Sequence, residues 1–431
     1  MKKEKLLHST KIQQMIAQYK HDMQLVDQLT TDAEPHYEIE QELYKKYEVK
    51  RGLRDLDGKG VRAGLTTISK VSATQIIDGR EVPAAGQLLY RGIPIEQLVQ
   101  GFITHDRFGF EEIVYLLLMG HLPKADQLAQ FKGLLTDYQE LPNHFNSGVI
   151  MKMPSDNIMN TMAKCVLALH AYDPKPDDTS LPNVMRQCVQ LVSQFPSLAV
   201  FGYQASMYFR NDRSMFIQKP DPKLSIAENI LYMMRPDGKY TRLEAKLLDL
   251  CLVLHAEHGG GNNSAFTVHV VSSSGTDTYS TVAAALGSLK GPKHGGANIK
   301  VMEMFEDLKQ HCPDWEDEDA LREYLKGLLR GEGFDHSGLI YGMGHAVYSV
   351  SDPRAVILKS FVEQLSDEKG CHAEYQLYAT VERLAKEVIT QNRNTRVPAV
   401  GAGRGGDGAA VDYQPAVGVD AVAFAGLAGD L

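Results

Sequence analysis

The sequence predicts a mostly α-helical protein, and three observations lead to this fold class. The chain has 431 residues, 43% of them hydrophobic, so it can bury one large core or two joined ones. Apolar residues recur at helical spacing along most of the chain after residue 100. Strands with alternating apolar and polar residues are scarce in that part, and we see no internal repeat.

The first part of the chain combines a helical segment with short strands. Residues 1–50 are polar and helix-prone, with Ile12, Met15 and Ile16 at helical spacing. From residue 51 the residue pattern changes to short apolar runs interrupted by glycine. This pattern predicts small strands and turns.

Helices dominate the sequence that follows. The first starts near Phe110, has a broad apolar face, stops at Gly120 and restarts after Pro123. A second has Ser155 as its expected N-cap. The segment 241–258 is nearly apolar all round, which is typical of a central, buried helix.

Composition and charge narrow the classes of partner. The net charge of −9 argues against nucleic acid or an anionic membrane as the main partner, although a small acidic ligand needs only a local positive pocket. We expect a cytoplasmic protein, because the sequence shows no apolar signal segment and no run approaching the roughly eighteen apolar residues of a membrane span. The cysteines are odd in number and widely spaced, which suits a reducing compartment. They are Cys165, Cys188, Cys251, Cys312 and Cys371.

The motif HAEHGGGNNSAF sets two histidines against a run of glycines. We expect His255 and His258, three residues apart, to share one face at the end of the buried helix. With Glu257 they suggest a metal site. Zinc needs three or four ligands of compatible geometry, and neither the cysteine spacing nor a second close histidine pair supplies them, so we expect no metal. A helix-end histidine bonded to backbone carbonyls is the simplest alternative. Two features favour a functional loop instead. The glycines allow left-handed backbone, and Asn262 can cap the next helix. The backbone amides at that helix end are then free to bind an anion.

The motif GPKHGGAN repeats this arrangement. Gly291 and Pro292 stop one helix, and a new helix starts near Ala297, with His294 between them. A histidine at a helix N-terminus tends to stay neutral, because the helix dipole disfavours the imidazolium ion. A neutral imidazole can donate a hydrogen bond to a carbonyl that is becoming an enol.

A third motif, GLIYGMGHAVYSVSDPRA, combines His345 with Arg354. His345 follows a glycine, and Arg354 follows a proline. Arginine binds carboxylates through two parallel hydrogen bonds, so this pair suits a substrate that carries a carbonyl beside a carboxylate. Taken alone, the motif would be read as a turn followed by a surface arginine.

Together these motifs resemble those of the citrate synthase family. The resemblance runs from about residue 47 to about residue 392, and the motifs stand in the family's order. They are RGLRDLDGKGVRAGLTTIS, LLYRGIPIEQL, FEEIVYLLLMGHLP, HAEHGGGNNSAF, SLKGPKHGGAN and YGMGHAVYSVSDPRA.

The resemblance implies an architecture of two helical domains. After the N-terminal helical segment 1–50, it implies a large helical domain at 51–293 and a smaller helical domain at 294–396, with the active site in the cleft between them. No separate N-terminal β-domain, of the kind linked to NADH-regulated hexamers in the family, is apparent in the first segment. We therefore expect a homodimer.

The resemblance also implies roles for four residues. His294 would hydrogen-bond the thioester carbonyl of acetyl-CoA as it enolises, and His345 would polarise the ketone of oxaloacetate and protonate the new alkoxide. His258 and Arg354 would hold oxaloacetate. The implied activity is a Claisen-type condensation of acetyl-CoA with oxaloacetate and water to citrate and CoA. Acetyl-CoA is then a substrate, and neither a cofactor nor a metal is implied.

Residues 397–431 depart from the family. Sixteen of the final 31 residues are Gly or Ala, a composition that predicts a weakly ordered tail. The aspartate expected as catalytic base in an NVDFSG-like motif after His345 is absent, as are further arginines for oxaloacetate. Asp407 and Asp412 are candidate bases only by their position. The abrupt change after Asn394 leads to the hypothesis that the tail is an out-of-frame reading of the coding sequence.

Several functions therefore stay open. The first is a citrate synthase whose encoded tail is misread. A 2-methylcitrate synthase would use propionyl-CoA with the same histidines. A third hypothesis, from another class, is a non-catalytic binding or structural relative that retains the oxaloacetate pocket without a base. A helical protein with no ligand is the least favoured, given three specific motifs.

Overall fold

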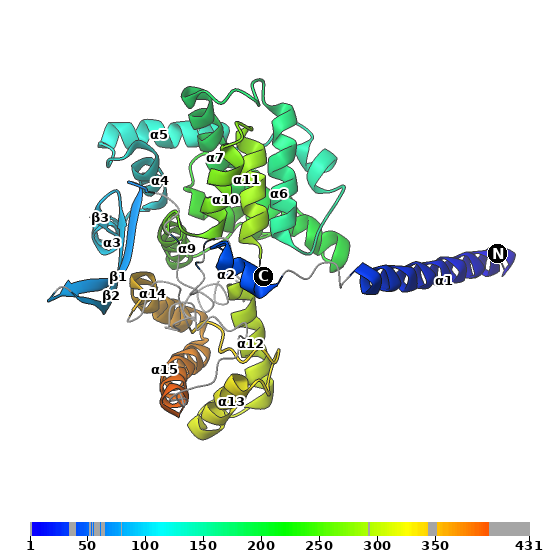
Figure 1. The fold of residues 1–431 in the computed structure, drawn as a ribbon. Helices are drawn as coiled ribbons and strands as arrows, with labels where there is room; N and C mark the ends of the chain where they lie inside the picture. Colours follow the sequence, from blue (N-terminus) through cyan, green and yellow to red (C-terminus); the bar gives the residue numbers. More distant parts are fainter. Residues whose placement is uncertain are drawn as a thin grey trace. The chain divides into compact units, whose positions relative to one another are not determined.

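The computed structural model describes residues 2–33, 40–50, 53, 55, 61, 65–78, 80–291, 294–343 and 351–395. The chain forms two compact units, residues 1–62 and residues 63–431. The first unit contains the helices α1 (Lys2–Ala33) and α2 (Gln41–Lys46). The second is predominantly helical, which confirms the predicted fold class (Figure 1). Among the described residues, no helix is both long and apolar enough to cross a membrane.

The elements of the second unit follow one another in this order. The strands are β1 (Ser69–Ile77), β2 (Arg80–Tyr90) and β3 (Ile93–Pro94). The helices are α3 (Ile95–Thr104), α4 (Phe110–Met119), α5 (Ala125–Tyr138), the π-helix η2 (Asn146–Ile150), α6 (Ile158–Leu169), the 3₁₀-helix η3 (His170–Tyr172), α7 (Leu181–Arg210), α8 (Ile226–Met234), α9 (Arg242–Leu254), α10 (Asn263–Ser272), α11 (Thr278–Leu289), α12 (Ala297–His311), α13 (Glu318–Arg330), α14 (Pro353–Lys369) and α15 (His372–Thr395).

The three strands form one small antiparallel sheet, as the short glycine-interrupted runs predict. Ser69 pairs with Tyr90 at one end of the β1–β2 ladder, and the register shifts at a bulge between Ser72 and Thr74. Tyr90 is fully buried, whereas Ile76 near the far end of the sheet is 79% exposed. The sheet therefore brings the end of β2 into the core.

The predicted stop and restart around Gly120 are confirmed. Gly120 adopts a left-handed φ of +86° and its N–H bonds the carbonyl of Leu116 at 2.8 Å, which closes α4. The expected cap of α6 is wrong. Asn157 caps this helix, because its side chain accepts from the N–H of Asn160 at 3.1 Å. Ser155 lies two residues before this cap, and its hydroxyl accepts from the N–H of Asn157.

Helix α9 is the centre of the largest apolar core, as its sequence predicts. Nine of its thirteen residues are buried. Apolar side chains of β2, α3, α4, α8 and α12 to α15 complete this core (Figure 1). A second core joins α6, α7 and α11. The largest core takes residues from both sides of position 294, and the division into a domain at 51–293 and a domain at 294–396 stays a prediction.

Two buried carboxylates on α9 connect this helix to its neighbours. Glu244 receives two hydrogen bonds from Arg235, at 2.7 and 2.8 Å, and a third contact from Lys369 at 2.6 Å. Burial by itself would raise the pKa of Glu244, but the hydrogen bonds from these cations outweigh it and lower the pKa to about 2. One turn further on, Asp249 accepts from the N–H of Gly109 at 2.7 Å, at the start of α4. Polar contacts thus fix α9 among apolar neighbours.

Candidate active site

The motif HAEHGGGNNSAF begins where α9 ends. The hydroxyl oxygen of Tyr90 lies 3.0 Å from the carbonyl of Val253 and 3.3 Å from that of Leu254, and it accepts from the N–H of Glu257 at 3.3 Å. The hydroxyl has one proton to donate, and the nearer acceptor is the carbonyl of Val253, so Tyr90 bonds the end of the helix, which ends at Leu254. The prediction that His255 and His258 share a helix face is therefore wrong, because His258 lies in the loop beyond the helix.

The loop after α9 is held by its own polar side chains. Gly259 has a left-handed φ of +83°, and its N–H donates to the Glu257 carboxylate at 2.6 Å. The same carboxylate accepts from the hydroxyl of Ser69 at 2.8 Å, which ties the loop to β1. Asn262 caps α10, as predicted, through the N–H of Ala265 at 2.8 Å. Glu257 thus braces the loop, and the half-buried His258 lies within it.

His294 lies between α11 and α12, as predicted, and contacts the first glycine motif. Its Nε2 is 3.0 Å from the hydroxyl oxygen of Ser264 and 3.4 Å from the backbone nitrogen of Ser264. Burial lowers the pKa of His294, which favours the neutral imidazole. A Cβ at Gly295 would lie 2.6 Å from the carbonyl oxygen of Leu289, so only glycine fits behind the histidine. Two motifs thirty residues apart thus meet at one contact.

Arg354 lies at the start of α14, beside a buried carboxylate. Asp352 caps this helix and is bonded by Arg354 through Nη2 at 2.7 Å and Nε at 3.1 Å. The Asp352 side chain is fully buried and that of Arg354 is 16% exposed. Burial raises the pKa of the Tyr90 hydroxyl. The charge of Arg354 lowers this pKa, and the charges of Glu257 and Asp352 raise it. The arginine therefore lies within electrostatic reach of the residue that ends α9.

Some predicted site residues lie outside the described part of the chain. His345 is among them, as are Asp407 and Asp412. Two supporting contacts were not predicted, that of Tyr90 with the end of α9 and that of Ser264, expected only as a possible helix cap, with His294. Ser264 lies in HAEHGGGNNSAF and Tyr90 in LLYRGIPIEQL, but no local pattern shows that they would meet a histidine or a helix end far along the chain.

One cluster of potential metal ligands occurs among the described residues. His170, Asp177 and Asp277 have ligand atoms within 4.8 Å of one another. Each has another explanation, because Nε2 of His170 lies 3.1 Å from the carboxylate of Asp177 and Asp277 caps α11 through the N–H of Ser280 at 2.8 Å. None of these residues belongs to the three glycine-flanked motifs, so the cluster does not bear on the site.

Comparison with known proteins identifies the family. Residues 53–402 match the family model for the citrate synthase C-terminal domain. A citrate synthase of Acidithiobacillus ferridurans is 34% identical over 76% of this chain and 78% of its own length, and a 2-methylcitrate synthase of Shewanella oneidensis is 31% identical over 78% and 80%. The crystal structure of citrate synthase from Pyrobaculum aerophilum superposes with a TM-score of 0.66 at 25% identity, over 88% of this chain and 85% of that one. This chain therefore belongs to the citrate synthase family.

Proposed function

We propose that this chain is built to condense acetyl-CoA with oxaloacetate and water, giving citrate and CoA. The contact between His294 and Ser264 carries the proposal. It joins the loop that contains His258 to the loop that contains the half-buried His294, whose pKa is lowered by burial, next to the N-terminus of α10. This arrangement can hold an anionic substrate beside a group that donates to a developing enolate.

The role proposed for His294 requires a proton on the ring nitrogen that faces substrate. The α-carbon of a thioester is a weak acid, so a donor must stabilise the enol oxygen while a base removes the proton. When the backbone N–H of Ser264 donates to Nε2, the neutral imidazole carries its proton on Nδ1. Nδ1 is then the donor to the acetyl carbonyl.

The second substrate carries two carboxylates, which need fixed positive partners. We assign Arg354 to one of them, with Asp352 holding the guanidinium in place through its Nε and Nη2. His258 is the second proposed ligand, and His345 is the proposed donor to the ketone. A citrate synthase of Thermoplasma acidophilum, whose fold is similar with a TM-score of 0.66, was solved as a ternary complex with carboxymethyl coenzyme A and oxaloacetate. That complex supports small-molecule substrates of this kind.

The proposal is tested by CoA release with oxaloacetate and acetyl-CoA. The assay compares the chain as written with a version whose residues 397–431 are replaced by the aspartate-containing segment of a citrate synthase relative. The restored version should release CoA with acetyl-CoA. If it releases none with any acyl-CoA, the proposed reaction is wrong.

A second candidate is the 2-methylcitrate synthase reaction, which is favoured by relatives of that name at about the same identity as the citrate synthases. The same assay with propionyl-CoA separates the two, because a higher kcat/KM for propionyl-CoA would transfer the proposal to this reaction. Either reaction proceeds without a cofactor or metal of its own. We also propose a cytoplasmic location.

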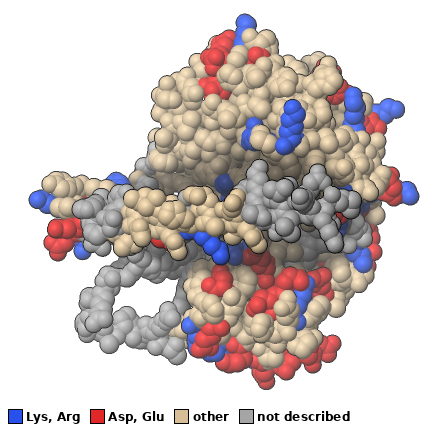
Figure 2. Space-filling view, turned by 90° about the vertical axis from the view of Figure 1, so that its right-hand side faces the viewer, with Lys and Arg blue, Asp and Glu red and all other residues tan. Residues whose placement is uncertain are grey.

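We further propose a homodimer through α10 and its neighbours. No residue of α10 is buried, although the helix is rich in apolar residues. Val270 on α10 is 53% exposed, and Leu167 on α6 is 52% exposed. Figure 2 shows acidic side chains gathered on the lower part of the molecule. An exposed apolar surface of this kind is typical of a subunit contact.

A further inference from the structure

The β1–β2 hairpin contacts both segments of the chain to which oxaloacetate-binding residues are assigned. One is the loop 255–262 after α9, which contains His258. The other leads into α14, whose first turn contains Arg354. These segments are far apart in the sequence, and β2 lies against α14 (Figure 1). The hairpin can therefore fix the position of one segment relative to the other.

The end of the hairpin holds the loop after α9 through Glu257. Ser69, the first residue of β1, donates its hydroxyl to Oε1 of Glu257 at 2.8 Å, and the same oxygen accepts from the N–H of Gly259 at 2.6 Å. Tyr90, which pairs with Ser69 in the ladder, accepts from the N–H of Glu257 at 3.3 Å. Glu257 and Gly259 are the two neighbours of His258 in the chain. The backbone on both sides of His258 thus depends on contacts with the hairpin.

A bulge in the hairpin holds the segment before α14. The register of the ladder shifts in this region, which leaves residues 84–86 of β2 unpaired with β1. In the bulge, the buried Gly86 donates its N–H to the carbonyl of Ser351 at 3.0 Å. Ser351 directly precedes Asp352, which bonds the guanidinium of Arg354. The strand pair that braces the His258 loop is therefore also bonded to the segment that positions the arginine.

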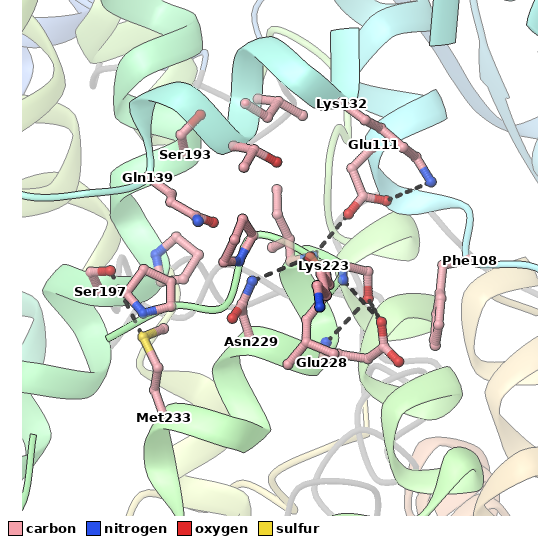
Figure 3. Close-up of a pocket in the computed structure, with 18 residues that line it drawn as sticks. Phe108, Glu111, Lys132, Gln139, Ser193, Ser197, Lys223, Glu228, Asn229 and Met233 are labelled. Atoms are coloured by element: carbon pink, nitrogen blue, oxygen red, sulfur yellow. Dashed lines mark hydrogen bonds and ion pairs between the residues drawn. The ribbon is translucent and has the colours of Figure 1, made fainter. Parts of the chain in front are cut away.

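Helix α9 gives the His258 loop a fixed starting point. Asp249 of α9 accepts from two N–H groups at the start of α4, at 2.7 and 3.1 Å. Glu111 of α4 accepts from the N–H of Ile226 at the start of α8, at 2.8 Å, in the wall of a cavity of about 250 Å³ (Figure 3). None of the residues that line this cavity belongs to the candidate active site. These contacts join three helices, so the course of the loop depends on what holds it beyond the end of α9.

The charge of Glu257 gives its contact with Ser69 a second effect. Oxaloacetate carries two carboxylates, and Glu257 is the neighbour of a residue proposed to bind one of them. The hydroxyl of Ser69 holds the half-buried Glu257 carboxylate toward β1. Once released, the carboxylate can turn toward the substrate, and two like charges at short range repel each other. Loss of the hydroxyl should therefore weaken binding through both geometry and charge.

We propose that Ser69 is a positioning residue for oxaloacetate. It acts through Glu257, which holds His258 at the distance from Arg354 that the two carboxylates of the substrate require. The bond from Gly86 fixes the arginine side of the same arrangement. This assignment rests on the proposed function, in which His258 and Arg354 bind oxaloacetate.

The test is calorimetry with oxaloacetate, together with hydrogen exchange, on the full chain. Ser69→Ala removes the hydroxyl and should weaken oxaloacetate binding at least about threefold, with faster amide exchange in residues 255–262. Ser69→Thr keeps a hydroxyl on the strand and should restore the affinity to within about twofold. The matched control is Ser72→Ala, a half-buried serine of the same strand whose hydroxyl bonds Gln87 at 3.4 Å within the hairpin. Unchanged affinity in Ser69→Ala, or an equal loss in Ser72→Ala, would overturn the assignment.

Kinetics of the version with the restored C-terminal segment separate positioning from a general loss of stability. Ser69→Ala should raise the KM for oxaloacetate at least about threefold and leave the KM for acetyl-CoA unchanged. An equal rise in both KM values would show a merely structural role and contradict the proposal. Failure of the proposed function has a different signature, because the unsubstituted chain would then bind no oxaloacetate while amide exchange in residues 255–262 still responded to Ser69→Ala. That result would also remove Ser69 from substrate binding.

Discussion

At the scale of single residues, small polar side chains hold the groups proposed to act on substrate. Ser264 contacts the imidazole of His294, and Asp352 orients the guanidinium of Arg354. Tyr90 likewise supports the loop that contains His258. Its hydroxyl lies within hydrogen-bond distance of two carbonyls at the end of α9 and accepts from the N–H of Glu257. Supporting groups of this kind fix geometry to within fractions of an ångström, on which binding and catalysis depend.

The first prediction concerns His294. His294→Ala in the version with the restored C-terminal segment should lower turnover by about 10²–10⁴-fold, the usual loss for a positioned acid or donor. Oxaloacetate affinity should stay nearly unchanged, because His294 is assigned to the other substrate. Steady-state kinetics and calorimetry check both values. Near-normal turnover would remove His294 from the mechanism.

The second prediction concerns Tyr90. Tyr90→Phe keeps the buried ring but removes the acceptor of the Glu257 N–H and the donor to the carbonyl at the end of α9, at a cost of about 1–3 kcal/mol of stability. The loop with His258 should loosen, and oxaloacetate affinity should fall severalfold. Thermal unfolding and calorimetry measure the two effects, with the 46% exposed Tyr208→Phe as control. Equal affinity in both variants would show that Tyr90 does not position the loop.

At the scale of elements, α9 organises the second unit. Its apolar residues fill the largest core, its Glu244 is bound by Arg235 and Lys369, and its Asp249 meets the first amides of α4. A buried acid in this position also makes stability depend on pH. The protonated form of Asp249 is favoured in the folded state, because burial raises the pKa of its carboxyl from 3.8 to about 7.

The third prediction follows from that shift. The folded state holds the Asp249 proton more tightly than the unfolded state, so the stability from this group is fully present below about pH 4 and is lost as the pH rises to about 7. The loss is at most about 1.4 kcal/mol per pH unit within this window. Asp249→Asn does not titrate. Urea unfolding from pH 5 to 8 should therefore show the natural protein losing stability relative to the variant, and parallel curves would contradict the assignment.

At the scale of the whole molecule, the candidate site draws on residues from β2 to α14, and the proposed reaction needs one group more. The base that should remove the α-proton is absent from the sequence where the family motif would place it, and residues 397–431 lie outside the described part of the chain. The helices that would form the subunit contact are present in the described part. Binding of substrate and catalysis can therefore be separated by experiment.

The fourth prediction is that the chain as written binds oxaloacetate but hardly turns over. Loss of a general base commonly costs about 10²–10⁴-fold, and missing substrate arginines would add to it. Calorimetry with oxaloacetate and CoA release with acetyl-CoA measure the two properties on the same preparation. Full turnover by this chain would refute the prediction and direct attention to Asp407 and Asp412 as bases.

The fifth prediction concerns assembly. Val270→Asp places a charge on the exposed apolar face of α10 and should convert a dimer to a monomer, because a charge buried without a partner opposes association. Light scattering coupled to size-exclusion chromatography gives the mass. Val356→Asp, at a 65% exposed position on α14, is the matched control and should leave the mass unchanged. A dimeric Val270→Asp variant would show that the contact lies elsewhere.

The sequence by itself determined the fold class, the family and the helix boundaries that depend on local chemistry. Gly120 ends α4 because glycine adopts left-handed backbone without strain, and Asn262 caps α10 because its side chain reaches an amide three residues on. These effects act within one helical turn, so neighbouring residues narrow each boundary to a few positions. At α6 several capping residues compete, and Asn157 rather than the predicted Ser155 is the cap.

Only the tertiary structure decided where α9 ends and which side chains meet around the site. The expectation that His255 and His258 share a helix face was wrong because Tyr90, more than 160 residues earlier, binds the last carbonyls of that helix. The contact between Ser264 and His294 likewise depends on how α10 and α11 pack. A hydrogen bond between distant residues forms only after burial has brought its partners together and removed water from both, and no local propensity encodes that outcome.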